Sequence, residues 1–279
     1  MAYMNEEAIH NLIIFEDTLA QYISNEDIQK CVTFSQNNIK YYTGKEKLNL
    51  ERRKENVERI FFLQGDVLST VEKFMTSKIA VLDFASATTP GGGVLIGSKG
   101  QEEDLCRKTT LYFNLNSDKL REEYYKRNKV DINLIKRSDC IYIPGICILK
   151  NNNKMEERYQ NRVLKKIDII VCPAPNLRKQ TTEISNDKLF QYHMKRADSI
   201  FKSAIDNNIE TLVLGAFGCG AFRNPPELVA DVYKAAALKY GKYLKNIVFS
   251  VKEKGDLGHN TNIFRQMVLD IGGEVLDDA

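Results

Sequence analysis

The 279-residue sequence has no apolar run that approaches the roughly 18 residues expected of a membrane-spanning helix. Residues 1–25 also lack the basic start and uninterrupted apolar stretch that together form a secretory signal. With 43% apolar and 28% charged residues, the composition is typical of a soluble globular protein and not of a disordered one. We therefore expect a cytoplasmic protein that has no membrane partner.

The sequence also lacks the closely spaced pairs of histidines or cysteines that commonly bind metals. Its three histidines lie far apart in the sequence, and its six cysteines form no CxxC pair. Because a structural zinc site usually draws on such pairs, no metal site is expected. Several cysteines lie within apolar runs such as IDIIVCPAP, which is typical of buried free thiols in a reducing compartment and not of a disulfide framework.

A large excess of charge of either sign is missing as well. The 40 basic and 37 acidic residues leave a formal net charge of +3, which is too balanced for a surface that coats a polyanion. No sequence-specific nucleic-acid partner is therefore predicted. The basic clusters KRNK (126–129) and NLRKQ (176–180) are interpreted as solvated loops, with steering of an anionic substrate as the alternative.

What the sequence does contain is an alternation of strand-like and helical segments. Residues 5–25 carry apolar side chains at helical spacing and predict an amphipathic helix, after which a polar, lysine-rich stretch follows. From about residue 57, apolar runs predict strands at 59–66, 78–86, 140–149, 167–175, 211–217 and 246–251. Helices are predicted between them at 68–76, 101–114, 186–207, 226–240 and 261–271.

The near-continuous apolar character of these strands indicates that both faces of the sheet are covered. The order of elements predicts an α/β fold, a three-layer α/β/α domain around a mixed, largely parallel sheet over residues 57–279. Residues 1–56 are interpreted as a helical extension packed on that domain. We expect the chain to be a monomer.

Two glycine-rich segments follow predicted strands, at the strand ends where open α/β sheets bind their ligands. The first holds three consecutive glycines at 91–93, and the second is GAFGCGAFRNPPEL at 215–228, which leads into a helix expected to begin near Pro225 or Pro226. Glycine-rich turns before helices leave backbone N–H groups free to hold phosphate oxygens, so a diphosphate ligand is predicted. A tight turn of small, packed residues is the alternative interpretation of GCGAF.

Nucleotide-cofactor motifs are absent. Neither segment has the spacing of the dinucleotide-binding fingerprint, and no GxxxxGK[ST] motif follows, so no cofactor is predicted. Phe217 and Phe222 flank the glycines of the second segment, where an aromatic ring can pack on a ribose or a base. We expect one ring to belong to the core and Phe222, which lies later in the turn, to be exposed.

A glutamine and two glutamates, Gln101, Glu102 and Glu103, open the helix predicted beyond the triple glycine. Acidic residues in a first helical turn commonly complement the helix dipole, and this structural role is one interpretation. Their place after a glycine-rich strand-end loop favours a catalytic role instead. Because successive helix residues project about 100° apart, the two carboxylates are not expected to aim at the same atom, and their roles should differ. We expect one glutamate to transfer protons while its neighbour and Gln101 orient sugar hydroxyls.

Together these segments resemble the poly(ADP-ribose) glycohydrolases. The stretch PGGGVLIGSKGQEE is similar to their GGG-x(6–8)-QEE signature, and VLDFASATTPGGG, LCRKTTLY, PAPN and GAFGCGAFRNPPELVA are similar to the compact bacterial-type branch. The resemblance runs from about residue 57 to the C-terminus. It implies a macrodomain fold that binds the terminal ADP-ribose of poly(ADP-ribose) and, without a metal, hydrolyses the ribose–ribose O-glycosidic bond to release ADP-ribose.

The resemblance also implies roles for individual residues. Glu103 would be the catalytic acid and base, Glu102 would hold a ribose hydroxyl, and Gln101 would support the loop. The substrate-binding residues would be Ser86, Gly91, Gly92, Gly93, Gln101, Gly218, Cys219, Gly220, Ala221 and Phe222.

Within that set, the triple glycine would admit the distal ribose and the diphosphate, residues 218–221 would form a second diphosphate loop, and Phe222 would pack on the terminal ribose. Ser86 stands where the larger animal enzymes have an asparagine that contacts the ribose, and a serine has fewer hydrogen-bonding groups. The accessory domain of those enzymes is not evident, so binding inside a polymer chain would be poor.

Two other interpretations use the same loops. A hydrolase that removes a single ADP-ribose from a protein or nucleic acid would hold a different leaving group in the same pocket. A non-catalytic reader of ADP-ribosylated proteins would not need the two acids, so the intact QEE argues against it. An NAD-utilising enzyme is disfavoured by the loop spacings.

Overall fold

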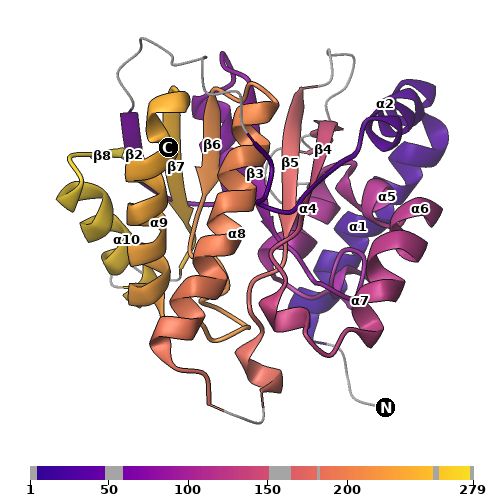
Figure 1. The fold of residues 1–279 in the computed structure, drawn as a ribbon. Helices are drawn as coiled ribbons and strands as arrows, with labels where there is room; N and C mark the ends of the chain where they lie inside the picture. The colour runs from indigo at the N-terminus through magenta and orange to yellow at the C-terminus, as the bar shows by residue number, and fades with distance from the viewer. Residues whose placement is uncertain (1–4, 48–58, 151–164, 181–182, 254–257, 277–279) are drawn as a thin grey trace.

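The computed structural model describes residues 5–47, 59–150, 165–180, 183–253 and 258–276 (Figure 1). Within these ranges, eight strands form one sheet in the order β1-β4-β5-β3-β6-β7-β2-β8. The strands are β1 Lys40–Tyr42, β2 Arg59–Gln64, β3 Ile79–Phe84, β4 Cys140–Cys147, β5 Lys166–Cys172, β6 Thr211–Leu214, β7 Asn246–Val251 and β8 Glu274–Leu276. Strand β4 pairs antiparallel with β1 and β5, and the other neighbours are parallel, which confirms the predicted mixed, largely parallel sheet.

Helices cover both faces of this sheet. They are α1 Glu6–Ser24, α2 Glu26–Asn37, α3 Val67–Lys73, α4 Gln101–Lys108, α5 Leu111–Leu115, α6 Asp118–Leu120, α7 Arg127–Val130, α8 Asn186–Asp206, α9 Pro226–Tyr240 and α10 His259–Asp270, with short 3₁₀ turns at Val94–Ile96, Leu134–Lys136, Leu177–Lys179 and Gly241–Tyr243 and a π-helical turn at Arg121–Lys126. Figure 1 shows α8 and α9 in front of the strands and α1 at the right, beside α4. None of the described helices is long and apolar enough to cross a membrane.

The core has two halves, one on each face of the sheet, because side chains alternate between the two faces along every strand. Successive strand residues point to opposite faces of a sheet. In β3, Ala80 and Leu82 therefore join the buried cluster beneath α8, α9 and α10, whereas Ile79 and Val81 join the cluster beneath α1, α3, α4 and α5. This three-layer α/β/α arrangement is the predicted fold class.

The predicted helix over 101–114 is wrong in one respect, because it is broken into α4 and α5. Thr109 is extended, with φ of −136° and ψ of 176°, and it forms an isolated antiparallel bridge with Ile148. The Thr110 N–H donates to the carbonyl of Cys147. The backbone of Thr109 and Thr110 therefore pairs with the end of β4 and its continuation instead of continuing the helix.

Several elements were missed by the sequence analysis. Helix α2 lies in the stretch described only as polar and lysine-rich; Asn25 caps it by accepting from the N–H groups of Asp27 and Ile28, and Ile28, Cys31 and Val32 are buried. The strands β1 and β8 have three residues each, too few for a clear alternation. The helical turns between 118 and 130 were also missed.

The N-terminal segment takes part in the sheet. Strand β1 pairs with β4, with Tyr41 opposite Ile141, and α1 carries Phe15 into the core. The predicted boundary between residues 56 and 57 lies outside the described residues, so the division into an extension and a catalytic domain stays a prediction.

Candidate functional site

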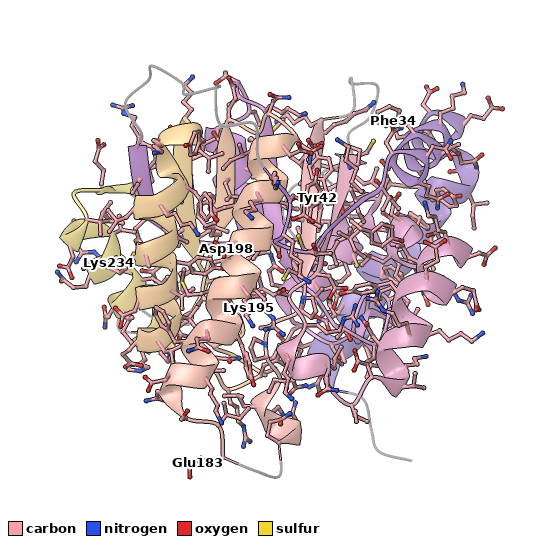
Figure 2. All side chains as sticks on the ribbon, in the orientation of Figure 1. Phe34, Tyr42, Glu183, Lys195, Asp198 and Lys234 are labelled. Atoms are coloured by element: carbon pink, nitrogen blue, oxygen red, sulfur yellow. The ribbon has the colours of Figure 1, made fainter. Side chains whose placement is uncertain are left out.

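The loops after β3, β5 and β6 enclose one cavity of about 750 Å³ at the carboxyl ends of the parallel strands. Figure 2 labels Glu183, in the segment between β5 and α8, at this edge of the molecule. Of the predicted site residues, all but Gly91 and Cys219 line the cavity. Gly91 is buried, and a β-carbon there would lie 2.8 Å from the ring of Tyr112. The Cys219 thiol instead lies 3.8 Å from the carbonyl oxygen of Phe217.

The two glutamates of α4 converge on one glycine. A β-carbon at Gly92 would lie 2.5 Å from Oε1 of Glu103 and 2.9 Å from Oε2 of Glu102, and Gly92 has a φ of +57°. Both flexible side chains bend toward the same loop, but each carboxylate binds a different backbone N–H, that of Ser86 for Glu102 and that of Gly93 for Glu103. A side chain at position 92 would displace these carboxylates, and it would also strain the backbone at this φ.

Their surroundings nevertheless differ. Glu102 is buried, at 3% exposure, and its Oε2 accepts a hydrogen bond of 2.7 Å from the N–H of Ser86. Glu103 is half-buried at the cavity wall, and its Oε1 accepts a hydrogen bond of 2.8 Å from the N–H of Gly93. Among the described residues the second oxygen of Glu103 has no hydrogen-bond partner. That oxygen is therefore available to a ligand in the cavity.

Gln101 fastens the start of α4 to the end of β3. Its Oε1 accepts from the N–H of Phe84 at 2.9 Å, and its Nε2 donates to the carbonyl of Leu82 at 2.8 Å. The amide thus pairs with the strand backbone as another strand would. Ser86, just beyond β3, accepts from the N–H of Thr89 through its hydroxyl at 3.1 Å, which shapes the turn toward the glycines.

A buried aspartate that sequence reasoning did not single out lies beside this pair. Asp83 of β3 is fully buried, and neither of its carboxyl oxygens has a hydrogen-bond partner among the described residues. Burial, followed by the charge of Glu103, raises its pKa well above the ordinary value. Burial, followed by the charge of Asp83, likewise raises the pKa of Glu102. A charged residue within the apolar run IAVLDFAS was the sequence signal for it.

The loop after β6 presents unpaired backbone donors. The N–H groups of Gly218, Gly220, Ala221 and Phe222 have no hydrogen-bond partner within the described ranges, and all four residues line the cavity. By contrast, the N–H of Gly93 is bound to Glu103, and that of Gly92 to the carbonyl of Thr89. A turn of free N–H groups holds anions well. The two loops therefore differ: the second can hold an anion, and the first holds a carboxylate.

Of the two phenylalanines of this loop, Phe217 lies in the core as expected, whereas Phe222 is less exposed than expected. Phe217 is a core residue, at 1% exposure, and its ring contacts those of Phe84 and His193. Phe222 is half-buried and lines the cavity.

A buried amide that the sequence analysis missed links two of the loops. Asn224 donates through Nδ2 to the carbonyls of Pro175 and Gly218, at 2.8 and 3.0 Å. Its Oδ1 lies 2.9 Å from Nε2 of His193, whose pKa is lowered to about 4 by burial. The neutral imidazole therefore donates to the amide and holds it in this orientation.

Arg196 of α8 is a buried cation that lines the cavity, and sequence reasoning missed it too. It is 1% exposed and donates to the carbonyls of Pro173, Tyr192 and Ile135, at 2.8 to 3.0 Å. No carboxylate forms an ion pair with it among the described residues. The guanidinium therefore joins two walls of the cavity and leaves a positive charge there without a counter-ion. Sequence reasoning missed it because the predicted helix over 186–207 contains several basic residues and nothing in the sequence distinguishes Arg196 from the others.

The arrangement can bind an anion and transfer a proton within one cavity. Its lining includes unpaired N–H groups, a buried guanidinium and a carboxylate with a free oxygen. Within the described ranges, no group of three or more histidine, cysteine, aspartate or glutamate side chains is placed to hold a metal ion.

Comparison with known proteins supports the resemblance found in the sequence. Residues 16–151 match the family model for the catalytic domain of microbial-type PARG, poly(ADP-ribose) glycohydrolase. The PARG of Thermomonospora curvata has a similar structure, with a TM-score of 0.79 and 21% identity over 92% of this chain and 98% of that one. The PARG of Deinococcus radiodurans, solved in complex with ADP-ribose, has a TM-score of 0.74 and 25% identity over 86% and 97%. No curated protein matches the chain.

Proposed function

From the match of residues 16–151 to the catalytic domain of microbial-type PARG, we propose that the protein is a compact bacterial-type poly(ADP-ribose) glycohydrolase. It hydrolyses the ribose–ribose O-glycosidic bond of poly(ADP-ribose), mainly at the chain terminus, and releases ADP-ribose. A T. curvata PARG of similar structure, with a TM-score of 0.77 and 22% identity, was solved with the inhibitor ADP-HPD.

One observation carries this proposal: Glu103 and the unpaired N–H groups of the second loop line the same cavity. ADP-ribose has an anionic diphosphate and a distal ribose that carries the scissile bond. The N–H groups of Gly218, Gly220 and Ala221 would bind the diphosphate, with Arg196 as its nearby positive charge. The distal ribose would then lie toward α4, where both glutamates contact Gly92.

In the proposed reaction, Glu103 acts first as an acid and then as a base. Its Oε1 stays bound to the N–H of Gly93, and the free Oε2 donates a proton to the leaving ribose oxygen as the anomeric C–O bond breaks. The carboxylate then takes a proton from the water that attacks the anomeric carbon. Glu102, whose pKa is raised by burial, would bind a ribose hydroxyl rather than react.

The substrate is tested by incubating the purified protein with defined poly(ADP-ribose) and, separately, with a mono-ADP-ribosylated peptide. Released ADP-ribose is identified by mass spectrometry. We expect loss of polymer with ADP-ribose as the earliest product and no early oligomers, as cleavage from the terminus requires. Rates should be equal with and without EDTA.

Three outcomes would contradict the proposal. Cleavage of the peptide alone would identify a mono-ADP-ribosyl hydrolase, and binding without release would identify a reader. Early oligomers would show cleavage inside the polymer.

We also propose that the enzyme works as a cytoplasmic monomer. Six free cysteines, five of them buried, fit a reducing compartment. Light scattering of the purified chain should give a mass near 31.9 kDa, and a mass twice as large would contradict the monomer.

A further inference from the structure

The first two turns of α1 lie against the segment that joins the triple glycine to α4. Asn11 is buried, and its Nδ2 donates a hydrogen bond of 2.9 Å to the carbonyl of Gly97. Gly97 has a φ of +71°, and a β-carbon there would overlap the carbonyl of Ala8. Lys99 forms an ion pair of 2.8 Å with Glu7. Helix α1 therefore holds residues 97–99 from outside the cavity.

The same short segment touches the loop that holds Glu103. A β-carbon at Gly93 would overlap the side chain of Ser98, and the Ser98 N–H donates to the carbonyl of Gly93 at 3.1 Å. The N–H of Gly93 in turn binds Oε1 of Glu103. A displacement of residues 97–99 would therefore move the donor that orients the carboxylate of Glu103.

A buried ion pair fixes where α1 lies along α4. Lys150 and Asp17 are 3.2 Å apart, with side chains 1% and 6% exposed. Lys150 also donates to the carbonyl of Ile14 at 2.8 Å and to that of Arg107, at the end of α4, at 3.3 Å. The Thr18 hydroxyl donates to the same Arg107 carbonyl. Breaking a buried pair is costly, so α1 has little freedom to slide on α4.

We propose that α1 positions Glu103. Asn11 is the residue of α1 that holds the loop in place, through its hydrogen bond to the carbonyl of Gly97. The inference rests on the proposed glycohydrolase function. Asn11, Ala8 and Glu7, which hold the loop, precede the residues 16–151 matched by the family model. Asn11 does not line the cavity, so it acts through the loop and not on the substrate.

The test compares Asn11→Ala and Asn11→Asp with wild type. Asn11→Asp keeps the size of the side chain but replaces the donor by an acceptor that faces the Gly97 carbonyl. We expect kcat to fall at least about fivefold in Asn11→Ala and further in Asn11→Asp, because small misplacement of a catalytic group is costly. The affinity for ADP-ribose should stay within about twofold, since the second loop is untouched.

A second measurement does not depend on activity. Hydrogen exchange of the amides between 93 and 98 should be faster in both variants, while the amides of β3 and β6 exchange as in wild type. Asn246→Ala is the matched control, because Asn246 is a similarly buried asparagine whose Nδ2 donates a hydrogen bond of 2.8 Å to the hydroxyl of Thr211. It lies at the first residue of β7, and the cavity lies at the other, carboxyl end of the strands. Asn246→Ala should lower the melting temperature but leave kcat and the exchange of residues 93–98 unchanged.

The outcomes separate this inference from the proposed function. Inactive wild type with faster loop exchange in Asn11→Ala would refute the glycohydrolase and leave the loop support standing. Active wild type with equal kcat and equal loop exchange in Asn11→Ala would overturn the inference. Equal losses of kcat in Asn246→Ala, or faster exchange throughout the molecule in Asn11→Ala, would also overturn it, because general destabilisation would then explain the effect.

Discussion

At the scale of the residue, Glu103 has the clearest expected role. Glu103→Gln keeps an oxygen that can accept from Gly93 but cannot act as an acid, so turnover of poly(ADP-ribose) should fall at least about a hundredfold. ADP-ribose affinity, measured by calorimetry, should stay within about twofold. Glu122→Gln, on the exposed surface, is the control and should keep wild-type turnover. Turnover at the wild-type rate in Glu103→Gln would refute the assignment.

The buried carboxyl of Asp83 leads to a prediction about stability and pH. Its pKa is raised by burial and then by the charge of Glu103, so folding takes up a proton above the unfolded pKa of about 3.9. The contribution of Asp83 to wild-type stability should therefore fall as pH rises from 4 to 8, and Asp83→Asn should lack this loss. The difference in melting temperature, variant minus wild type, should grow across that range.

Asp139→Asn is a control of opposite sign. Burial acts to raise the pKa of Asp139, but the hydrogen bonds and charges of Arg137 and Arg127 lower it overall. Its stabilising contribution is present above the unfolded pKa and is lost at lower pH, so Asp139→Asn should be most destabilised near neutral pH. The prediction would be contradicted if the difference in melting temperature between Asp83→Asn and wild type did not change with pH while that of Asp139→Asn did. Asp83 would then not be buried in its protonated form.

At the scale of the element, the loop after β6 depends on one strained position. Gly218 has a φ of +76°, and a β-carbon there would lie 2.5 Å from that of Ala174 and 2.6 Å from Nδ2 of Asn224. Gly218→Ala should destabilise the fold by about 1–3 kcal/mol and weaken ADP-ribose binding, because the loop must shift. Thermal unfolding and calorimetry measure the two effects.

Gly220 provides the comparison within the same loop. A β-carbon at Gly220 would meet no atom within 4 Å, and its backbone needs no left-handed conformation. Gly220→Ala should therefore leave the melting temperature unchanged. Equal destabilisation in the two variants would show that the conformation of Gly218 is not what shapes the loop.

At the scale of the whole molecule, the role of the N-terminal segment can be tested by truncation. A chain that starts at residue 57 lacks β1, α1 and α2. Phe15 would no longer cover Tyr112, and buried Lys150 would lose Asp17. We expect this fragment to lack a cooperative thermal transition by circular dichroism. Cooperative unfolding at the full-length melting temperature would show instead that residues 1–56 are a dispensable extension.

The sequence by itself determined the fold class and the two loops of the site. Apolar runs of strand length that alternate with helical periods specify a layered α/β fold. GGG, QEE and GCGAF follow predicted strands closely in the sequence, so their spacing was enough to place them at the strand ends. The break at Thr109 and the short strand β1 escaped it, because both depend on pairing with β4.

Only the tertiary structure decided which groups meet. The convergence of both carboxylates on Gly92, the buried Asp83 beside them and the cation of Arg196 depend on packing across separate elements. The contact of Asn11 with Gly97 joins residues 86 positions apart in the chain. Spacing along a sequence specifies neighbours within a helix or strand, whereas contacts of this range exist only once the layers have packed.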